Sequence, residues 1–160
     1  MEKRVRSTAE LLEDKDSILE LYNSPQPRSK KAPFLTSKEK KVLGIGKDMG
    51  MSSLKFARIS SSKVKIVLDL IKGKGIDEAY AILKYTPKGA SEILLKLLKS
   101  AESNAVNNNN LDRDLLYVDE AYANQGPTMK RVKPIARGSA NRILKRSSHI
   151  TLILKERKVQ

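Results

Sequence analysis

A long basic stretch without a single carboxylate places the strongest constraint on the fold of this chain. No aspartate or glutamate occurs from Ala121 to Lys155. The stretch contains two segments that favour extended backbone, Leu115 to Val132 and Arg142 to Leu154, joined by turn-rich sequence. The second segment ends in alternating aliphatic and polar residues, which is typical of a strand with one buried face. We therefore expect a long β-hairpin at about residues 115–154.

This hairpin is too long to be buried by the rest of the chain. Arms of this length reach roughly 40–60 Å at ~3.3 Å per residue. A body of about 80 residues has a radius of gyration near 12 Å. We therefore expect the distal part to project, as a two-stranded ribbon that is only marginally stable in water. Like charges on adjacent strands weaken such a ribbon further, so it requires a polyanion around it.

The net charge of the chain agrees with a polyanionic partner. The formal net charge is +14, and residues 51–160 carry 21 basic and 10 acidic residues against 11 and 8 in residues 1–50. Nucleic acid gains binding free energy from such a surface through counterion release. An anionic membrane is an alternative, but the hairpin lacks the apolar face that membrane insertion needs. Charge alone does not separate RNA-binding from DNA-binding proteins.

Several classes of enzyme are excluded by composition. The chain has no cysteine, which excludes a thiol nucleophile, a disulfide framework and a cysteine-ligated zinc. His149 is the only histidine, and its sequence neighbours suggest no nucleophile or carboxylate partner. No apolar run reaches the ~18 residues of a membrane span, and aromatic residues are too few for a deep ligand pocket. We expect a protein that is not an enzyme, with no cofactor, metal, small-molecule substrate or membrane partner.

Helical periodicity appears between the N-terminal region and the hairpin. Val64, Val67, Leu68 and Ile71 form one apolar stripe, and serines 60–62 offer helix N-caps. A second short helix is predicted with Asp77 as its cap, and a third from Thr86-Pro87, with its stripe running from Ala90 to Ala105. The predicted fold class is α+β: a small body of three helices packed on a short antiparallel sheet, with the projecting hairpin and an extended N-terminal tail.

The first part of the chain is less regular. Ser7 and Glu10 have the spacing of a capping box and predict one short helix. Asn23 to Pro33 is rich in proline and reads as a linker. We assign residues 1–53 to a partly flexible N-terminal extension and residues 54–160 to an α+β nucleic-acid-binding domain.

The hairpin also carries a recognisable motif. Residues 126–134 read GPTMKRVKP and residues 136–150 read ARGSANRILKRSSHI. Together they resemble the GPxxKRxxPRAxGRA signature of the bacterial ribosomal protein family L-twenty-two. Ala57 to Val64 and Ala101 to Ala105 are similar to the family's segments at the start of its first helix and the end of its third. The resemblance covers about residues 54–156, and residues 1–53 match no part of the family that we can name.

The resemblance implies a role in the ribosome. The chain would be a structural constituent of the large subunit that binds large-subunit ribosomal RNA and supports its assembly. Its body would lie near the exit of the nascent-peptide tunnel, and its hairpin tip would line the tunnel. The implied partners are this RNA, neighbouring large-subunit proteins and the nascent peptide, in the cytoplasm. The alternative is a free-standing nucleic-acid-binding or regulatory module outside the ribosome.

This sequence departs from the family pattern at three positions. Ile135 and Ser139 stand where the family usually has arginine at the tip, and Gln125 stands where an acidic residue usually precedes Gly-Pro. The tip is therefore less charged than is usual in the family.

The predicted RNA-binding residues fall into three sets. First choices for phosphate contacts are the hairpin cations, because arginine and lysine neutralise phosphates: Lys130, Arg131, Lys133, Arg137, Arg142, Lys145 and Arg146. Second choices lie at the start of the first helix of the domain, where backbone amides add donors: Arg58, Lys63 and Lys65. Met129, Gly138 and His149 complete the set, and Gly138 is expected to adopt a positive φ at the turn.

Two interpretations of the extension stay open. It could dock on RNA or protein through Lys30, Lys31, Lys38, Lys40 and Lys41. It could instead precede a start at Met51.

Overall fold

The computed structural model describes residues 7–24 and 35–157. The chain divides into two compact units, Met1–Lys47 and Asp48–Gln160. The described residues form six α-helices, three in each unit, and two antiparallel sheets, both in the second unit. The α+β class predicted from the sequence is confirmed. Most of the predicted Asn23–Pro33 linker, with Lys30 and Lys31, lies outside the described residues.

The second unit contains all of the strands that the structure describes. In chain order its elements are β1 (Met49–Ala57), α4 (Ser61–Ile71), α5 (Ile76–Tyr85), α6 (Ser91–Ser103), β2 (Leu116–Gln125), β3 (Met129–Pro134), β4 (Ala140–Lys145) and β5 (Ser148–Glu156). A π-helical turn, Asn104–Asn108, continues α6, and a 3-10 turn, Arg113–Leu115, precedes β2.

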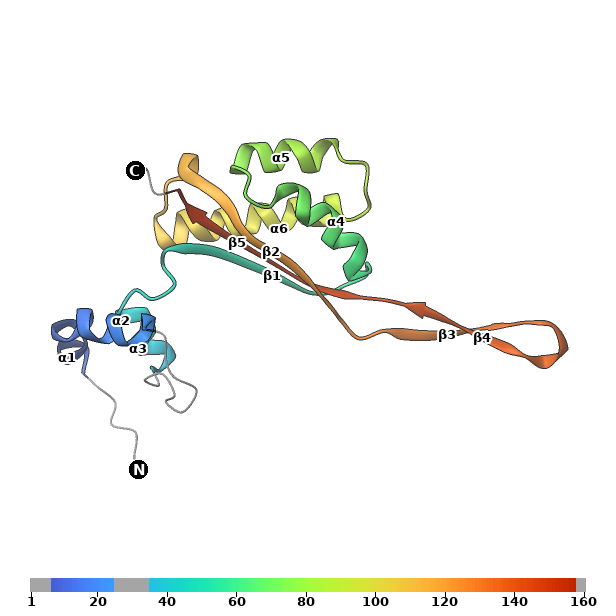
Figure 1. Ribbon diagram of the computed structural model, residues 1–160, viewed down its shortest axis with the longest axis horizontal. Coiled ribbons are helices and arrows are strands. Elements are labelled where there is room, and N and C mark those ends of the chain that lie inside the picture. Colours follow the sequence, from blue (N-terminus) through green and yellow to red (C-terminus); the bar gives the residue numbers. More distant parts are fainter. Residues whose placement is uncertain (1–6, 25–34, 158–160) are drawn as a thin grey trace, which may run out of the picture. The chain divides into compact units, whose positions relative to one another are not determined.

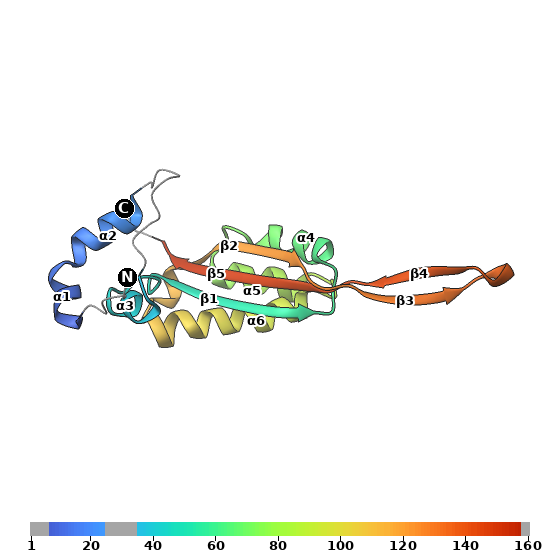
Figure 2. The same ribbon diagram turned by 90° about the horizontal axis from the view of Figure 1, so that it is seen from below.

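A three-stranded antiparallel sheet in the order β1-β5-β2 forms the body together with α4, α5 and α6. The three helices cover one face of this sheet (Figures 1 and 2). In the central strand β5, Ile150, Leu152 and Leu154 are at most 1% exposed. The alternation predicted for this strand is therefore confirmed, and each of these side chains contributes about 1.5–3 kcal/mol through burial.

The predicted apolar stripes pack on the sheet. Val64, Val67, Leu68 and Ile71 of α4 are buried, and so are Leu94, Leu97, Leu98 and Ala101 of α6. Those side chains make a common core with the inward face of β5.

Two predicted helix starts were wrong. Gly75, and not Asp77, is the N-cap of α5, so the Asp77 carboxylate is free to bind another partner. Thr86 is the C-cap of α5 and has extended backbone, because Pro87 disfavours the helical conformation in the residue before it. Helix α6 then begins at Ser91.

Strand β1 was not predicted from the sequence. Its inward positions include Gly50 and Ser52, which are small and give no apolar alternation. A Cβ atom at Gly50 would lie 2.5 Å from the Ala105 Cβ and 2.7 Å from the Ala101 carbonyl oxygen. The small residues are therefore required by the close approach of α6 to the strand. Since β1 begins at Met49, it includes residues that the sequence analysis had assigned to the extension.

The predicted hairpin is present as two consecutive ladders. Strand β2 pairs with β5 inside the sheet, and β3 pairs with β4 beyond it (Figure 1). Between the ladders, the Gly126 N–H donates to the Ser147 carbonyl at 2.9 Å, and the Ser147 hydroxyl donates to the Pro127 carbonyl at 2.6 Å. Pro127 has no N–H to continue a ladder, which explains the interruption.

The described part of the first unit, residues 7–24 and 35–47, contains three short helices instead of one helix in an extended tail. These are α1 (Thr8–Glu13), α2 (Lys15–Asn23) and α3 (Ser37–Val42). The predicted capping box of Ser7 and Glu10 is confirmed, and Thr36 and Glu39 form a second one that was not predicted. Leu11, Ile18, Leu35 and Leu43 make a small buried cluster. That cluster supplies the packing that short helices need in water.

Candidate nucleic-acid interface

The β3–β4 ribbon presents cations on both of its faces. All twelve residues of the two strands are exposed. Directly paired residues of an antiparallel ladder share a face, and successive residues alternate. Arg131, Lys133 and Lys145 therefore lie on one face, while Lys130 and Arg142 lie on the other. A ribbon with this distribution suits a polyanion that surrounds it better than one that lies against a single side.

The register of the ribbon avoids direct repulsion between cations. Lys145 pairs with Met129, Lys130 with Leu144, Arg131 with Ile143, Arg142 with Val132, and Lys133 with Asn141. Every cation in the ladder thus faces a neutral residue on the partner strand. Cations of the two strands, such as Lys130 and Arg142, are instead diagonal neighbours on the same face. The weakening of the ribbon by like charges stays a prediction.

The tip of the ribbon contains two consecutive residues with positive φ. Gly138 has φ 72°, as predicted, and Arg137 has φ 62° and ψ 31°. The turn is closed by the Ile135 N–H, which donates to the Ser139 carbonyl at 2.8 Å. A left-handed conformation costs a non-glycine residue about 1–2 kcal/mol. Arg137 carries the only charged side chain between Ile135 and Asn141. The turn therefore fixes the backbone from which this side chain extends.

A basic groove lies where the ribbon leaves the body. It has a volume of about 870 Å³ and is formed by the segment before α4 with the first turns of that helix, the α5–α6 connection and the base of β4. Its cations come from all three segments: Arg58, Lys63, Lys88, Lys145 and Arg146. No carboxylate lines it. This set, called the basic groove below, combines residues from both the first and the second choices of the sequence analysis.

Lys88 is the groove residue that the sequence analysis missed. The sequence 86–90 was interpreted as the start of a helix, whereas it forms the connection between α5 and α6. The Thr86-Pro87 pair gave the wrong signal, and the following Lys88-Gly89 is a loop signal that could have corrected it.

The remaining predicted residues lie outside the groove. Lys65 is exposed on α4 but does not line the groove. Lys130, Arg131, Lys133, Arg137 and Arg142 belong to the ribbon and its tip. Met129 links the two regions, because the Arg58 guanidinium donates to its sulfur at 2.9 Å. The structure thus places the predicted cations at the start of α4, along the ribbon and at its tip.

His149 has a defined contact in the sheet. Its Nδ1 accepts a hydrogen bond from the Phe56 N–H at 3.0 Å. The ring proton of this tautomer therefore lies on Nε2. The two rings meet edge to face, with centroids 4.8 Å apart.

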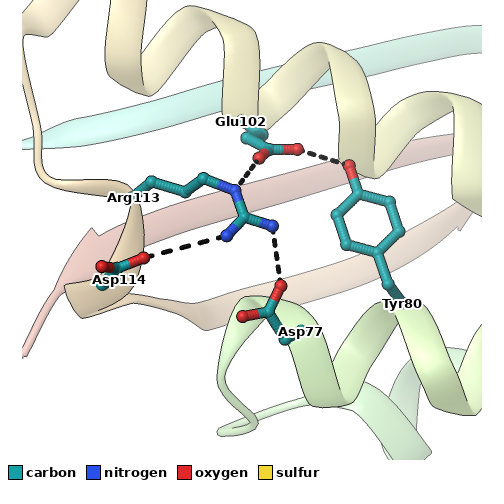
Figure 3. Close-up of polar contacts among 5 residues, drawn as sticks. All are labelled: Asp77, Tyr80, Glu102, Arg113 and Asp114. Atoms are coloured by element: carbon teal, nitrogen blue, oxygen red, sulfur yellow. Dashed lines mark hydrogen bonds and ion pairs between the residues drawn. The ribbon is translucent and has the colours of Figure 1, made fainter.

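Acidic side chains gather at the opposite end of the body, around Arg113 (Figure 3). Its guanidinium donates to Glu102 and Asp77, both at 2.7 Å, and the Tyr80 hydroxyl donates to Glu102 at 2.6 Å. Burial and this hydrogen bond raise the pKa of Tyr80 well above its ordinary value. These contacts join α5, α6 and the turn before β2. The cluster thereby stabilises the packing of these three segments.

A second ion pair lies on the sheet near the same end. The Lys155 ammonium is 2.7 Å from an Asp119 carboxylate oxygen. This contact lowers the pKa of Asp119 and raises that of Lys155. Because Leu116 at the start of β2 pairs with Glu156 at the end of β5, Asp119 and Glu156 lie far from the β3–β4 ribbon. Strands β2 and β5 thus carry their carboxylates away from the ribbon, whereas residues 129–145 and the lining of the basic groove contain none.

Two further classes of site have no counterpart in residues 7–24 and 35–157. No helix there is long and apolar enough to cross a membrane, and no group of three or more potential metal-ligating side chains comes together.

Comparison with known proteins identifies the family. The family model described as ribosomal protein L22p/L17e matches residues 52–155. The chain belongs to this family. The match covers β1 to β5 almost completely, so the basic groove and the ribbon are both parts of the family domain.

Individual relatives support the same assignment. The chain is 73% identical over 124 residues to the large ribosomal subunit protein uL22 of Acetivibrio thermocellus, covering 78% of this chain and 99% of that protein. It is 61% identical over 103 residues to the uL22 of Clostridium novyi, covering 64% of this chain and 93% of the relative. Residues 51–160 number only 110, so the 124-residue alignment with the Acetivibrio protein includes residues before Met51.

Proposed function

We propose that this chain is a structural constituent of the large ribosomal subunit and binds large-subunit ribosomal RNA through the basic groove and the ribbon. The observation that carries this proposal is the fully exposed ribbon with cations on both faces, in a member of a ribosomal protein family. Phosphates on both sides of the ribbon neutralise these cations and release counterions. Contacts of this kind position a protein on RNA without reading much sequence.

The proposed site residues act as a set. In the groove, Arg58, Lys63, Lys145 and Arg146 bind phosphates together with Lys88. Along the ribbon, Lys130, Arg131, Lys133, Arg137 and Arg142 do so, and Lys65 contributes from the exposed side of α4. Met129 holds Arg58 in place, Gly138 shapes the tip, and His149 orders the base of the hairpin. The role is binding and support of RNA assembly, not catalysis.

The finer placement follows the family. The body lies near the exit of the nascent-peptide tunnel, beside neighbouring large-subunit proteins, and the hairpin tip lines the tunnel in cytoplasmic ribosomes. The composition of the tip supports this, because Ile135 and Ser139 leave Arg137 as its only charge. A nearly neutral wall suits a surface along which peptides of any charge must move.

Sedimentation tests the proposal. We expect the full-length protein to co-migrate with large subunits after a moderate salt wash, because many phosphate contacts act together. A variant that lacks residues 129–145 should be released at much lower salt. Protein that is found only in the free pool would instead favour a regulatory module outside the ribosome.

Hydrogen exchange tests the dependence of the ribbon on RNA. In isolated protein, the β3–β4 amides should exchange far faster than those of β5, since an exposed two-stranded ribbon is marginally stable. Binding to ribosomal RNA should slow exchange in the ribbon. Strong protection of residues 130–142 without RNA would contradict the proposal.

A further inference from the structure

Phe56 occupies a backbone position that normally favours glycine. The β1–β5 register passes from Leu54 opposite Ile150 to Ala57 opposite Ser148. Lys55 and Phe56 therefore both face His149, and the irregularity is a β-bulge. Phe56 has φ 59° within it. Positive φ is uncommon for any non-glycine residue and is an outlier for a bulky one. Such outliers gather at functional sites and justify a functional hypothesis.

The surrounding contacts hold Phe56 in place without covering it. Its N–H donates to His149 Nδ1 at 3.0 Å, and its ring meets the imidazole at an interplanar angle of 82°. In this edge-to-face geometry His149 covers at most one flat face of the phenyl ring. The residue remains 59% exposed. The contacts with His149 thus hold the phenyl ring of Phe56, on a strained backbone, at the surface of the protein.

The surface beside Phe56 suits nucleic acid. A shallow groove of about 490 Å³ lies there, with Met51, Lys55 and Thr151 among its lining residues and no carboxylate. The carboxylates of this sheet, Asp119, Glu120 and Glu156, lie toward its other end, where β2 begins and β5 ends. Two residues after Phe56, Arg58 belongs to the basic groove. The ring therefore stands next to cations that are available for phosphates.

We propose that Phe56, supported by His149, is a stacking platform for one unpaired base of bound RNA, an inference that rests on the proposed RNA-binding function. An aromatic ring accepts any base, because every base has a flat π-face. Cations beside such a ring follow the RNA backbone. The bulge aims the ring, and Lys55 and Arg58 bind the adjoining phosphates.

The test compares a short oligoadenylate with an abasic ribose–phosphate chain of the same length. Both chains carry the same charge, but only the oligoadenylate has bases that can stack. A difference in affinity therefore reports stacking and not charge. We expect the full-length protein to prefer the oligoadenylate by about tenfold. Phe56→Asn should reduce this preference at least fivefold, because asparagine tolerates positive φ but offers no ring. Its melting temperature should stay close to that of the original protein. An unchanged preference would overturn the proposal.

A second variant supplies a direct optical readout. The chain contains no tryptophan, so Phe56→Trp introduces a single indole fluorophore at the platform. Oligoadenylate should quench its emission, and the abasic chain should not. If both quench equally or neither does, no base stacks at this position. If neither RNA binds any form of the protein, the proposed function itself fails, which is a different result from the loss of base preference alone.

Discussion

Replacing Lys63, Lys88, Lys145 and Arg146 together by glutamine is expected to weaken binding to large-subunit ribosomal RNA by about 100-fold near physiological ionic strength. All four side chains line the basic groove and are exposed, so their loss leaves the core intact. Each phosphate contact that disappears removes the release of about one counterion. The slope of log K against log salt should therefore fall by about 3–4. Filter binding across a salt series measures both quantities.

A variant with the same change in charge provides the control. Lys72, Lys84, Lys96 and Lys99 are also exposed, but none of them lines the groove. Their replacement by glutamine should cost less than about fivefold in affinity, because only long-range attraction is lost. Equal losses for the two quadruple variants would mean that the protein binds RNA through its net charge, without a defined groove.

Gly50→Ala should destabilise the second unit by about 2–3 kcal/mol. The new methyl group would lie 2.5 Å from the Ala105 Cβ and 2.7 Å from the Ala101 carbonyl oxygen. Neither atom belongs to a flexible side chain, so β1 and α6 must move apart, and overpacking of this kind typically costs 1–3 kcal/mol. Urea denaturation followed through the amide resonances of β5 measures the free energy of unfolding of this unit.

Gly89→Ala is the matched control for that experiment. A Cβ atom at Gly89 would have nothing within 4 Å, and its φ is not positive. Its free energy of unfolding should be unchanged or raised by up to about 1 kcal/mol, since alanine restricts the unfolded chain. A Gly50→Ala protein as stable as Gly89→Ala would show that β1 and α6 are not in close contact.

Periodic segments were predictable because their own pattern carries the information. The stripe of Val64, Val67 and Leu68 and the alternation of Ile150 and Leu152 were identified correctly. Strand β1 was missed because its inward side chains at Gly50 and Ser52 are small. The size of those residues is set by the neighbouring helix, which no local pattern reveals.

The candidate interface was likewise predictable only in part. The charge of the ribbon and the positive φ of Gly138 could be inferred from residue types. The basic groove could not, because Lys88 comes close to Lys63 and Arg146 only after three separate segments have packed together. Phe56 was overlooked because neither its bulge nor its contact with His149 leaves a trace in composition or spacing.

The α+β body and the cationic hairpin were predictable from the sequence alone, since they follow from periodicity and from the absence of carboxylates between residues 121 and 155. The tertiary structure alone decided the register that places every ribbon cation opposite a neutral residue, the grouping of the basic groove and the display of Phe56. These features depend on distances between residues far apart in the chain. Such distances are set by packing and strand pairing, which local sequence preferences do not specify.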